Sequence, residues 1–231
     1  MDGSIATGRK FNMNKPFVNP VSTQNLLEEG KDVVINTFLQ IPNLLSKSEI
    51  SRFNNFICEQ ECIPVGLDGI KDNYQGGDRI GSYRLSIYNK EMADILWNRI
   101  YKESSFLEED KWVPIGVNPL FRVIIYKEGG ELIPHYDAPY IQDENIMTRK
   151  SMVIYLTDNA EGTTDFLYDN QDECPIKDYS DRQGYQGKMM ASFIPVAGSS
   201  LIFNHRVLHS VKPLESEEKT IIRTDIIYKR K

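Results

Sequence analysis

The feature that most constrains the fold is a series of short strand-like segments that fills the second half of the chain. From Asn118 onward, eight such segments follow one another, separated by turns containing Gly, Asp and Asn and with no long helix between them. The segments are PLFRVIIY, LIPHYD, KSMVIYLTD, TTDFLY, MASFIPV, SSLIFNH, VLHSVKPL and KTIIRTDIIY. Short strands in this arrangement are typical of an antiparallel sandwich or barrel.

Long helices are predicted in the first half. The segment LLSKSEISRFNNFICEQ predicts a helix in which Ser46 and Glu49 form a capping box. A second helix is predicted over NKEMADILWNRIYKE, capped by Asn89 and with apolar residues at near-helical spacing. The segments DVVINTF and DRIGSYRLSIYN are strand-like. Helices first and strands afterwards indicate the α+β class, with N-terminal helices packed on a β-jelly-roll core.

The chain is expected to form one domain with an N-terminal extension. Residues 1–30 are polar and rich in Asn, Ser, Thr and Gly, which predicts an extended arm. We expect residues 31–231 to be a single domain, since 231 residues with 40% hydrophobic content can bury a sizeable core. The longest irregular piece, residues 169–188, is acidic and rich in turn formers, as in a functional lid or a surface loop.

Charge and cysteine content narrow the classes of partner. The net charge of −6 argues against a protein that binds nucleic-acid backbones, which would normally show a basic stripe. We see no signal-peptide pattern and no apolar run of membrane-spanning length. The odd number of cysteines (Cys58, Cys62 and Cys174) predicts a reducing compartment, so we expect a cytoplasmic protein. Cys58 and Cys62, four residues apart, could share a helix face and are expected to be buried small side chains rather than a metal pair.

One pair of residues suggests a metal site. His135 and Asp137 lie two positions apart in LIPHYDAPY, so a strand would direct both side chains to the same face. A neutral imidazole beside a carboxylate suits a divalent metal. One more histidine would complete the two-histidine, one-carboxylate triad that binds Fe(II) and leaves positions open. The candidates for this second histidine are His205 and His209 in FNHRVLHSVKPL.

The surrounding motifs resemble a known family. HYD, then HSVKP, then Arg223 in IIRTDIIY resemble the motifs of the iron(II)- and 2-oxoglutarate-dependent dioxygenases, in particular the prolyl 4-hydroxylase-like branch. The resemblance covers roughly residues 115–230. It implies a double-stranded β-helix, which is a cupin-like jelly roll.

The resemblance also implies which histidine binds iron. The distal ligand of the family lies in a His-x-Val-x-Pro context after a strand with the pattern found here at Gly198, Leu201 and Phe203. This context selects His209, so His135, Asp137 and His209 are the implied iron ligands and catalytic residues. His205 is expected to be a surface residue or to lie behind the ligands.

A basic residue is implied for the distal carboxylate of 2-oxoglutarate. We assign Arg223, 14 residues after His209, because an arginine in a strand of Ile, Thr and Tyr is costly unless it is paired. In many family members the basic residue lies closer, at the spacing of Lys219, but Lys219 ends the charged turn ESEEK and is expected to be solvated. Tyr126 and Tyr155 match positions that hydrogen-bond the cosubstrate, although core tyrosines also serve packing alone.

Two further features concern the surroundings of the iron. Glu161 in EGTTDF stands where the family often has glycine, so the local turn is expected to differ. Period-two alternation places Asn118 and Arg122 on the same strand face as Tyr126. We therefore expect Arg122 and Asn118 to contact the substrate, through a carboxylate or a polar backbone. Arg84 is a further candidate.

The function implied by the resemblance is that of an oxidoreductase. Such an enzyme uses Fe(II), 2-oxoglutarate and O₂ to hydroxylate an unactivated C–H bond, and releases succinate and CO₂. Because Asp137 is present, hydroxylation is expected rather than halogenation, for which relatives replace this carboxylate by a small residue. We expect a small-molecule substrate (an amino acid, a peptide or a natural product), with neither nucleic acid nor membrane as partner. The alternatives are a prolyl-type protein hydroxylase and a non-catalytic cupin-like metal-binding protein.

Overall fold

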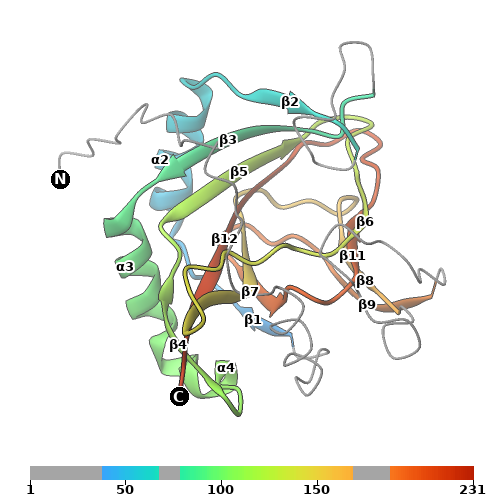
Figure 1. The fold of residues 1–231 in the computed structure, drawn as a ribbon. Coiled ribbons are helices and arrows are strands. Elements are labelled where there is room, and N and C mark those ends of the chain that lie inside the picture. Colours follow the sequence, from blue (N-terminus) through green and yellow to red (C-terminus); the bar gives the residue numbers. More distant parts are fainter. Residues whose placement is uncertain (1–37, 68–78, 169–187) are drawn as a thin grey trace.

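Two antiparallel sheets lie face to face in the computed structural model, which describes residues 38–67, 79–168 and 188–231 (Figure 1). The larger sheet has eight strands in the order β1-β10-β7-β12-β5-β3-β2, with β4 paired to β12, and the smaller sheet has the order β6-β11-β8-β9. The strands of the larger sheet are β1 (Leu39–Ile41), β2 (Ile63–Val65), β3 (Ser82–Tyr88), β4 (Trp112–Val117), β5 (Leu120–Tyr126), β7 (Ile146–Tyr155), β10 (Ser200–Asn204) and β12 (Lys219–Arg230). Those of the smaller sheet are β6 (Leu132–His135), β8 (Thr164–Leu167), β9 (Met189–Phe193) and β11 (His209–Val211).

The predicted helices and their caps are confirmed. Helix α2 (Lys47–Cys58) begins after Ser46, whose Oγ accepts a hydrogen bond from the Glu49 backbone N–H at 3.3 Å, while the Glu49 carboxylate accepts from the Ser46 backbone N–H at 2.8 Å. Helix α3 (Lys90–Ile100) begins after Asn89, whose Oδ1 accepts from the Met92 backbone N–H at 2.9 Å. The 3₁₀-helix η3 (Tyr101–Glu103) and the short helix α4 (Ser104–Leu107) continue from α3.

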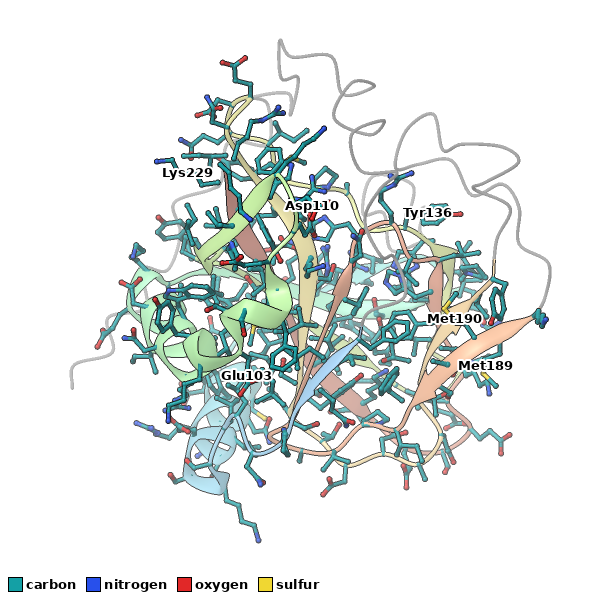
Figure 2. All side chains as sticks on the ribbon, turned by 90° about the horizontal axis from the view of Figure 1, so that it is seen from below. Glu103, Asp110, Tyr136, Met189, Met190 and Lys229 are labelled. Atoms are coloured by element: carbon teal, nitrogen blue, oxygen red, sulfur yellow. The ribbon has the colours of Figure 1, made fainter. Side chains whose placement is uncertain are left out.

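Alternation along the strands of the larger sheet separates two cores. One face packs against the helices: Val123, Ile154 and Ile222 lie in a cluster with Leu96 and Ile100 of α3. The opposite face carries Ile124, Val153 and Ile221 and packs toward the smaller sheet. Seen from below in Figure 2, Met189 and Met190 of β9 lie on the side of the molecule opposite to Glu103 and the helices.

The predicted strands agree closely with the structure. Each of the eight segments after Asn118 contains a strand, β5 to β12, and β3 lies in the segment DRIGSYRLSIYN. This arrangement confirms the double-stranded β-helix predicted from the sequence, with α2 and α3 on the outer face of the larger sheet. The strands β1, β2 and β4 were not predicted; β1 and β2 have only three residues each, too few to show a periodicity.

Some predictions fall elsewhere. Cys58 and Cys62 do not share a helix face, because α2 ends at Cys58. The expectation that both are buried is wrong as well, since Cys58 is exposed and Cys62 is half-buried; both are free thiols. The N-terminal arm, most of the segment DVVINTF, the lid candidate and Cys174 lie outside the described residues, in 1–37 and 169–187. Within the described ranges, no helix has the length and apolarity needed to cross a membrane.

Candidate metal and cosubstrate site

Three side chains from the smaller sheet converge between the two sheets. His135 at the end of β6 is the register partner of His209 at the start of β11, and their ring centroids are 4.2 Å apart. Asp137 follows β6, and its backbone N–H donates to the His205 carbonyl at 3.0 Å. The potential ligand atoms of His135, Asp137 and His209 all lie within 4.8 Å of one another. The structure therefore brings the predicted triad together.

The hydrogen bonds of both histidines prepare them for metal binding. Nδ1 of His135 lies 2.9 Å from the Ile133 carbonyl, and Nδ1 of His209 lies 2.9 Å from the Val207 carbonyl. A carbonyl oxygen can only accept, so Nδ1 carries the proton and the lone pair of each ring is on Nε2. Both Nε2 atoms approach Asp137, at 3.9 Å for His135 and 3.6 Å for His209. This is the donor set, and the tautomer, that a divalent metal requires.

Burial and charge set the protonation states that suit a metal. Burial, with His209 nearby, lowers the pKa of His135 to about 3, and burial also lowers the pKa of His209. Burial alone would raise the pKa of Asp137, but the positive charge of Arg223 and the neighbouring histidines hold it well below its usual range. Two neutral imidazoles and one carboxylate are thus present at neutral pH, and these residues fit Fe(II).

The third histidine lies one layer behind the triad. His205 is 1% exposed, so the expectation of a surface position is wrong, whereas a position behind the ligands is confirmed. Its carbonyl accepts from Asp137, and its Nε2 lies 3.4 Å from Asp225 Oδ1. His205 follows β10, and its imidazole approaches Asp225 on β12, whereas the triad histidines end β6 and begin β11.

The second basic candidate, Lys219, lies in an apolar compartment. It is fully buried, so the expectation of a solvated side chain is wrong. Its Nζ donates to the Gly162 carbonyl at 2.6 Å, lies 3.4 Å from Thr164 Oγ1, and is within 5.7 Å of the ring centroids of Tyr126 and Tyr155. Desolvation lowers the pKa of Lys219 to about 7. Lys219 is inside because β12 begins with it, and the charged turn ends one residue earlier.

The departure from the family pattern at Glu161 supports this compartment. The Glu161 carboxylate accepts hydrogen bonds from the backbone N–H groups of Glu215 at 2.8 Å and Ser216 at 3.1 Å, in the turn before β12. Next to it, a Cβ on Gly162 would come within 2.9 Å of the Lys219 Cδ and 2.8 Å of a Leu214 methyl. Glu161 therefore holds the turn, and the absent side chain of Gly162 leaves room for the Lys219 stem.

Arg223 lies at the other end of the site. Its Nη2 is 3.0 Å from Asp137 Oδ1, 3.1 Å from Asp225 Oδ1 and 3.3 Å from Ser151 Oγ. Burial by itself would lower the pKa of Arg223, but the carboxylates of Asp137 and Asp225 raise it above its ordinary value. Ser151 Oγ also donates a short hydrogen bond to Asp137 Oδ2. The arginine that the sequence suggested for the cosubstrate thus pairs with the metal-ligand carboxylate.

The remaining predicted residues divide between the two ends. Tyr126 and Tyr155 are buried at the Lys219 end, where Tyr155 Oη lies 3.0 Å from Thr164 Oγ1. Arg122 lies at the Arg223 end, as its register partner on β5. Asn118 is there too, but both ends of its amide are already engaged: Nδ2 donates to Asp225 Oδ2 at 3.3 Å, and Oδ1 accepts from the Leu120 backbone N–H at 3.1 Å.

Sequence reasoning missed Ser151, Thr164 and Asp225, which hold the charged groups in place. For Asp225 a signal was available: it lies two residues after Arg223, on the same strand face. Lys219 is four residues before Arg223, so strand alternation places it on the same inner face. This pattern would have predicted that Lys219 is buried between the sheets. Thr164 had a signal as well, since it is a retained position of the family segment that EGTTDF resembles. Ser151 has none, because a single hydroxyl in a strand is common.

Comparison with known proteins agrees with this geometry. Residues 121–224, which contain all three members of the triad, match the family model described as the 2OG-Fe(II) oxygenase superfamily. No curated protein matches the sequence significantly.

Solved structures show the same fold at low sequence identity. A prolyl hydroxylase from Trichoplax adhaerens, in complex with a peptide fragment of the hypoxia inducible factor oxygen degradation domain, is 17% identical with a TM-score of 0.56, over 95% of this chain and 94% of that chain. The epimerase SnoN from nogalamycin biosynthesis is 14% identical with a TM-score of 0.56, over 91% of this chain and 84% of that chain, in a complex with Fe³⁺, alpha ketoglutarate and nogalamycin RO. The viral collagen prolyl hydroxylase of Paramecium Bursaria Chlorella virus-1 is 20% identical with a TM-score of 0.50, over 85% of this chain and 99% of that chain.

The family match, the jelly-roll fold and the converging His-Asp-His donors agree with one another. Fe(II) and 2-oxoglutarate are the cofactor and cosubstrate of this superfamily, and the residues present suit both. The family match assigns residues 121–224 to the 2OG-Fe(II) oxygenase superfamily, whose members are Fe(II)- and 2-oxoglutarate-dependent dioxygenases.

Proposed function

We propose that this dioxygenase hydroxylates an unactivated C–H bond of a small molecule, with iron held by His135, Asp137 and His209. The observation that carries the site assignment is the convergence of two Nε2 lone pairs and one carboxylate. Iron bound there supplies the O₂ chemistry that couples decarboxylation of 2-oxoglutarate to hydroxylation. One oxygen atom enters succinate, the other becomes the hydroxyl group of the product, and carbon 1 of 2-oxoglutarate leaves as CO₂.

We assign the distal carboxylate of 2-oxoglutarate to Lys219 rather than to Arg223. Among the described residues, Lys219 has no carboxylate within ion-pair distance, and it is surrounded by Tyr126, Tyr155 and Thr164. A buried ammonium without a counter-ion is costly, and the cosubstrate carboxylate would supply one. Tyr126, Tyr155 and Thr164 would keep water away from this pair and orient it. Arg223 already has two carboxylates, so its charge is satisfied within the protein.

A small-molecule substrate is supported by the charged groups at the Arg223 end. Their side chains lie mostly inside the sandwich, between Asp137 and the partly exposed Arg122. Fixed charges at this depth suit a compact polar substrate whose own charge reaches the inner face of β5. The competing substrate is a protein side chain of the prolyl type.

Succinate release tests the proposal. The parent protein, supplied with Fe(II) and 2-oxoglutarate under air, is expected to form succinate slowly, and faster with a panel of amino acids and related metabolites. His135→Ala should abolish both rates, whereas Arg52→Gln, an exposed residue of α2, should retain them. Stimulation by prolyl peptides and by none of the small molecules would overturn the small-molecule assignment. Equal succinate formation by His135→Ala would overturn the assignment of the iron site.

A further inference from the structure

One carboxylate at the Arg223 end, that of Asp225, is approached by several side-chain donors. Besides Arg223, Asp225 is approached by Asn118 Nδ2 at 3.3 Å, by His205 Nε2 at 3.4 Å and by Arg122 Nη1 at 3.7 Å. Arg122 is the most distant of these donors and lies beyond hydrogen-bonding range. Its Nη1 is buried and has no hydrogen-bond partner in the part of the chain that the structure describes.

Arg122 is also the most open member of this group. Its side chain is 28% exposed, compared with 14% for Arg223 and 3% for Asp225. On β5 its register neighbours are Arg223 on one side and Ser86 of β3 on the other. The carboxylate that comes nearest to Arg122 is that of Asp225 on β12, at 3.7 Å, and Asp225 also contacts Arg223. Burial, followed by the positive charge of Arg223, lowers the pKa of Arg122, although Asp225 and Asp137 act in the opposite direction. The protein therefore holds a guanidinium at the inner face whose ion pair with Asp225 is long and shared, and whose Nη1 has no hydrogen-bond partner among the described residues.

The charges around the iron leave an anion to be supplied. Fe(II) and the two carboxylates of 2-oxoglutarate cancel. Lys219, Arg122 and Arg223 then bring three positive charges when protonated. Asp137 and Asp225 bring two negative charges. At least one positive charge remains before Arg84 is counted, and Nη1 of Arg122 has no hydrogen-bond partner among the described residues.

We propose that Arg122 binds a carboxylate of the substrate, so that the substrate class is small carboxylic acids. This inference rests on the proposed function, since it concerns the substrate of that same site. The guanidinium fork pairs with a planar carboxylate through two parallel hydrogen bonds. The partner strand places Arg223, and through it Asp137, next to Arg122. A carboxylate on Arg122 would therefore hold the substrate beside the residues that would bind iron.

The test compares acids with their uncharged amides. The probes are free L-amino acids and simple aliphatic and aromatic monocarboxylates, each paired with its primary amide, together with one acidic peptide. They are added to the protein loaded with Fe(II) and 2-oxoglutarate under anaerobic conditions. The readout is the shift of the visible charge-transfer band, with affinities from equilibrium titration. We expect at least one small acid to shift the band, and its amide to bind at least about 10-fold more weakly.

Variants tie this preference to Arg122. Arg122→Gln should weaken binding of that acid by at least about 10-fold and leave the amide unaffected, whereas Arg122→Lys should restore part of the affinity. The matched control is Arg52→Gln, an exposed arginine on α2, which should bind the acid like the parent. The charge-transfer band and the thermal midpoint of each variant report whether it is folded and loaded.

The outcomes separate this inference from the proposed function. Equal binding of acid and amide, unchanged acid affinity in Arg122→Gln, or no shift with any small acid would each overturn the carboxylate assignment. A shift with the acidic peptide alone would overturn the small-acid class and favour a protein substrate. Absence of the charge-transfer band in the parent, before any probe is added, would instead contradict the proposed iron and cosubstrate site.

Discussion

Lys219 and Arg223 lie four residues apart on the inner face of β12, yet their surroundings are opposite. Lys219 is surrounded by two tyrosine rings, a hydroxyl and a backbone carbonyl, and desolvation lowers its pKa to about 7. Arg223 contacts two buried carboxylates, which raise its pKa. The difference shows that burial of a cationic side chain does not by itself indicate a site for an anionic ligand. A ligand is indicated where no carboxylate of the described residues lies within ion-pair distance, as at Lys219.

If Lys219 and Arg223 lie at opposite ends of the site, the metal should bind between them, with His209 rather than His205 as its second histidine ligand. His209→Ala removes a ligand atom, so the affinity for Fe(II) should fall by more than about 100-fold, beyond what loss of a supporting residue costs. His205→Ala removes a histidine whose side chain faces Asp225, so the affinity should change by less than about 10-fold. Anaerobic titration with Fe(II) measures both. Equal losses in the two variants would mean that the triad has been assigned wrongly.

The satisfied charge of Arg223 predicts a structural role. Arg223→Met leaves Asp137 and Asp225 without their shared partner, so the free energy of unfolding of the metal-free protein should fall by about 3 kcal/mol. Arg122→Met removes a guanidinium whose single ion-pair contact among the described residues is at 3.7 Å, so it should cost less than about 1 kcal/mol. Urea denaturation measures both. If Arg122→Met were the more destabilising of the two, the contrast drawn between these arginines would fail.

The lowered pKa of Lys219 predicts a pH dependence of cosubstrate binding. Below about pH 7 the lysine is protonated before 2-oxoglutarate arrives, whereas above it a proton must be taken up on binding. The affinity for 2-oxoglutarate should therefore fall as pH rises, by about 25-fold between roughly pH 6.5 and 8.5. Calorimetry in buffers of different ionisation enthalpy should show this proton uptake near the upper end of that pH range and little of it near the lower end. An affinity that does not change with pH, together with no proton uptake, would contradict the prediction that Lys219 is neutral above about pH 7 before 2-oxoglutarate binds.

The smallest expected effect concerns the turn that precedes Lys219. Glu161→Gln weakens the hydrogen bonds to the backbone of Glu215 and Ser216, so the start of β12 should become less well positioned. We expect the dissociation constant for 2-oxoglutarate to rise by about threefold, with the Fe(II) affinity unchanged. Glu91→Gln, on the exposed first turn of α3, is the control. An effect on iron rather than on 2-oxoglutarate would show that Glu161 acts on the other end of the site.

Most of the fold was predictable because the second half of the chain alternates strand-like segments with turn residues. The metal triad was predictable too, since His135 and Asp137 share a short motif and His209 lies in its own. The groups that Lys219 and Arg223 contact could not be predicted from the sequence. Whether a lysine after a charged turn is solvated depends on where the strand begins, and a shift of one residue reverses the face. The pairing of Arg223 with Asp137 joins β12 to the end of β6, and no local pattern reports a contact between separate sheets.

The most direct test of the account is the dissociation constant of 2-oxoglutarate for the Fe(II)-saturated, anaerobic protein and for Lys219→Met and Arg223→Met. Lys219→Met removes the cation assigned to the cosubstrate, so its dissociation constant should rise by about 100-fold. Arg223→Met, measured under conditions in which it remains folded and metal-bound, should stay within about threefold of the parent. A large loss in Arg223→Met with near-parental binding in Lys219→Met would contradict the account and return the cosubstrate to the arginine.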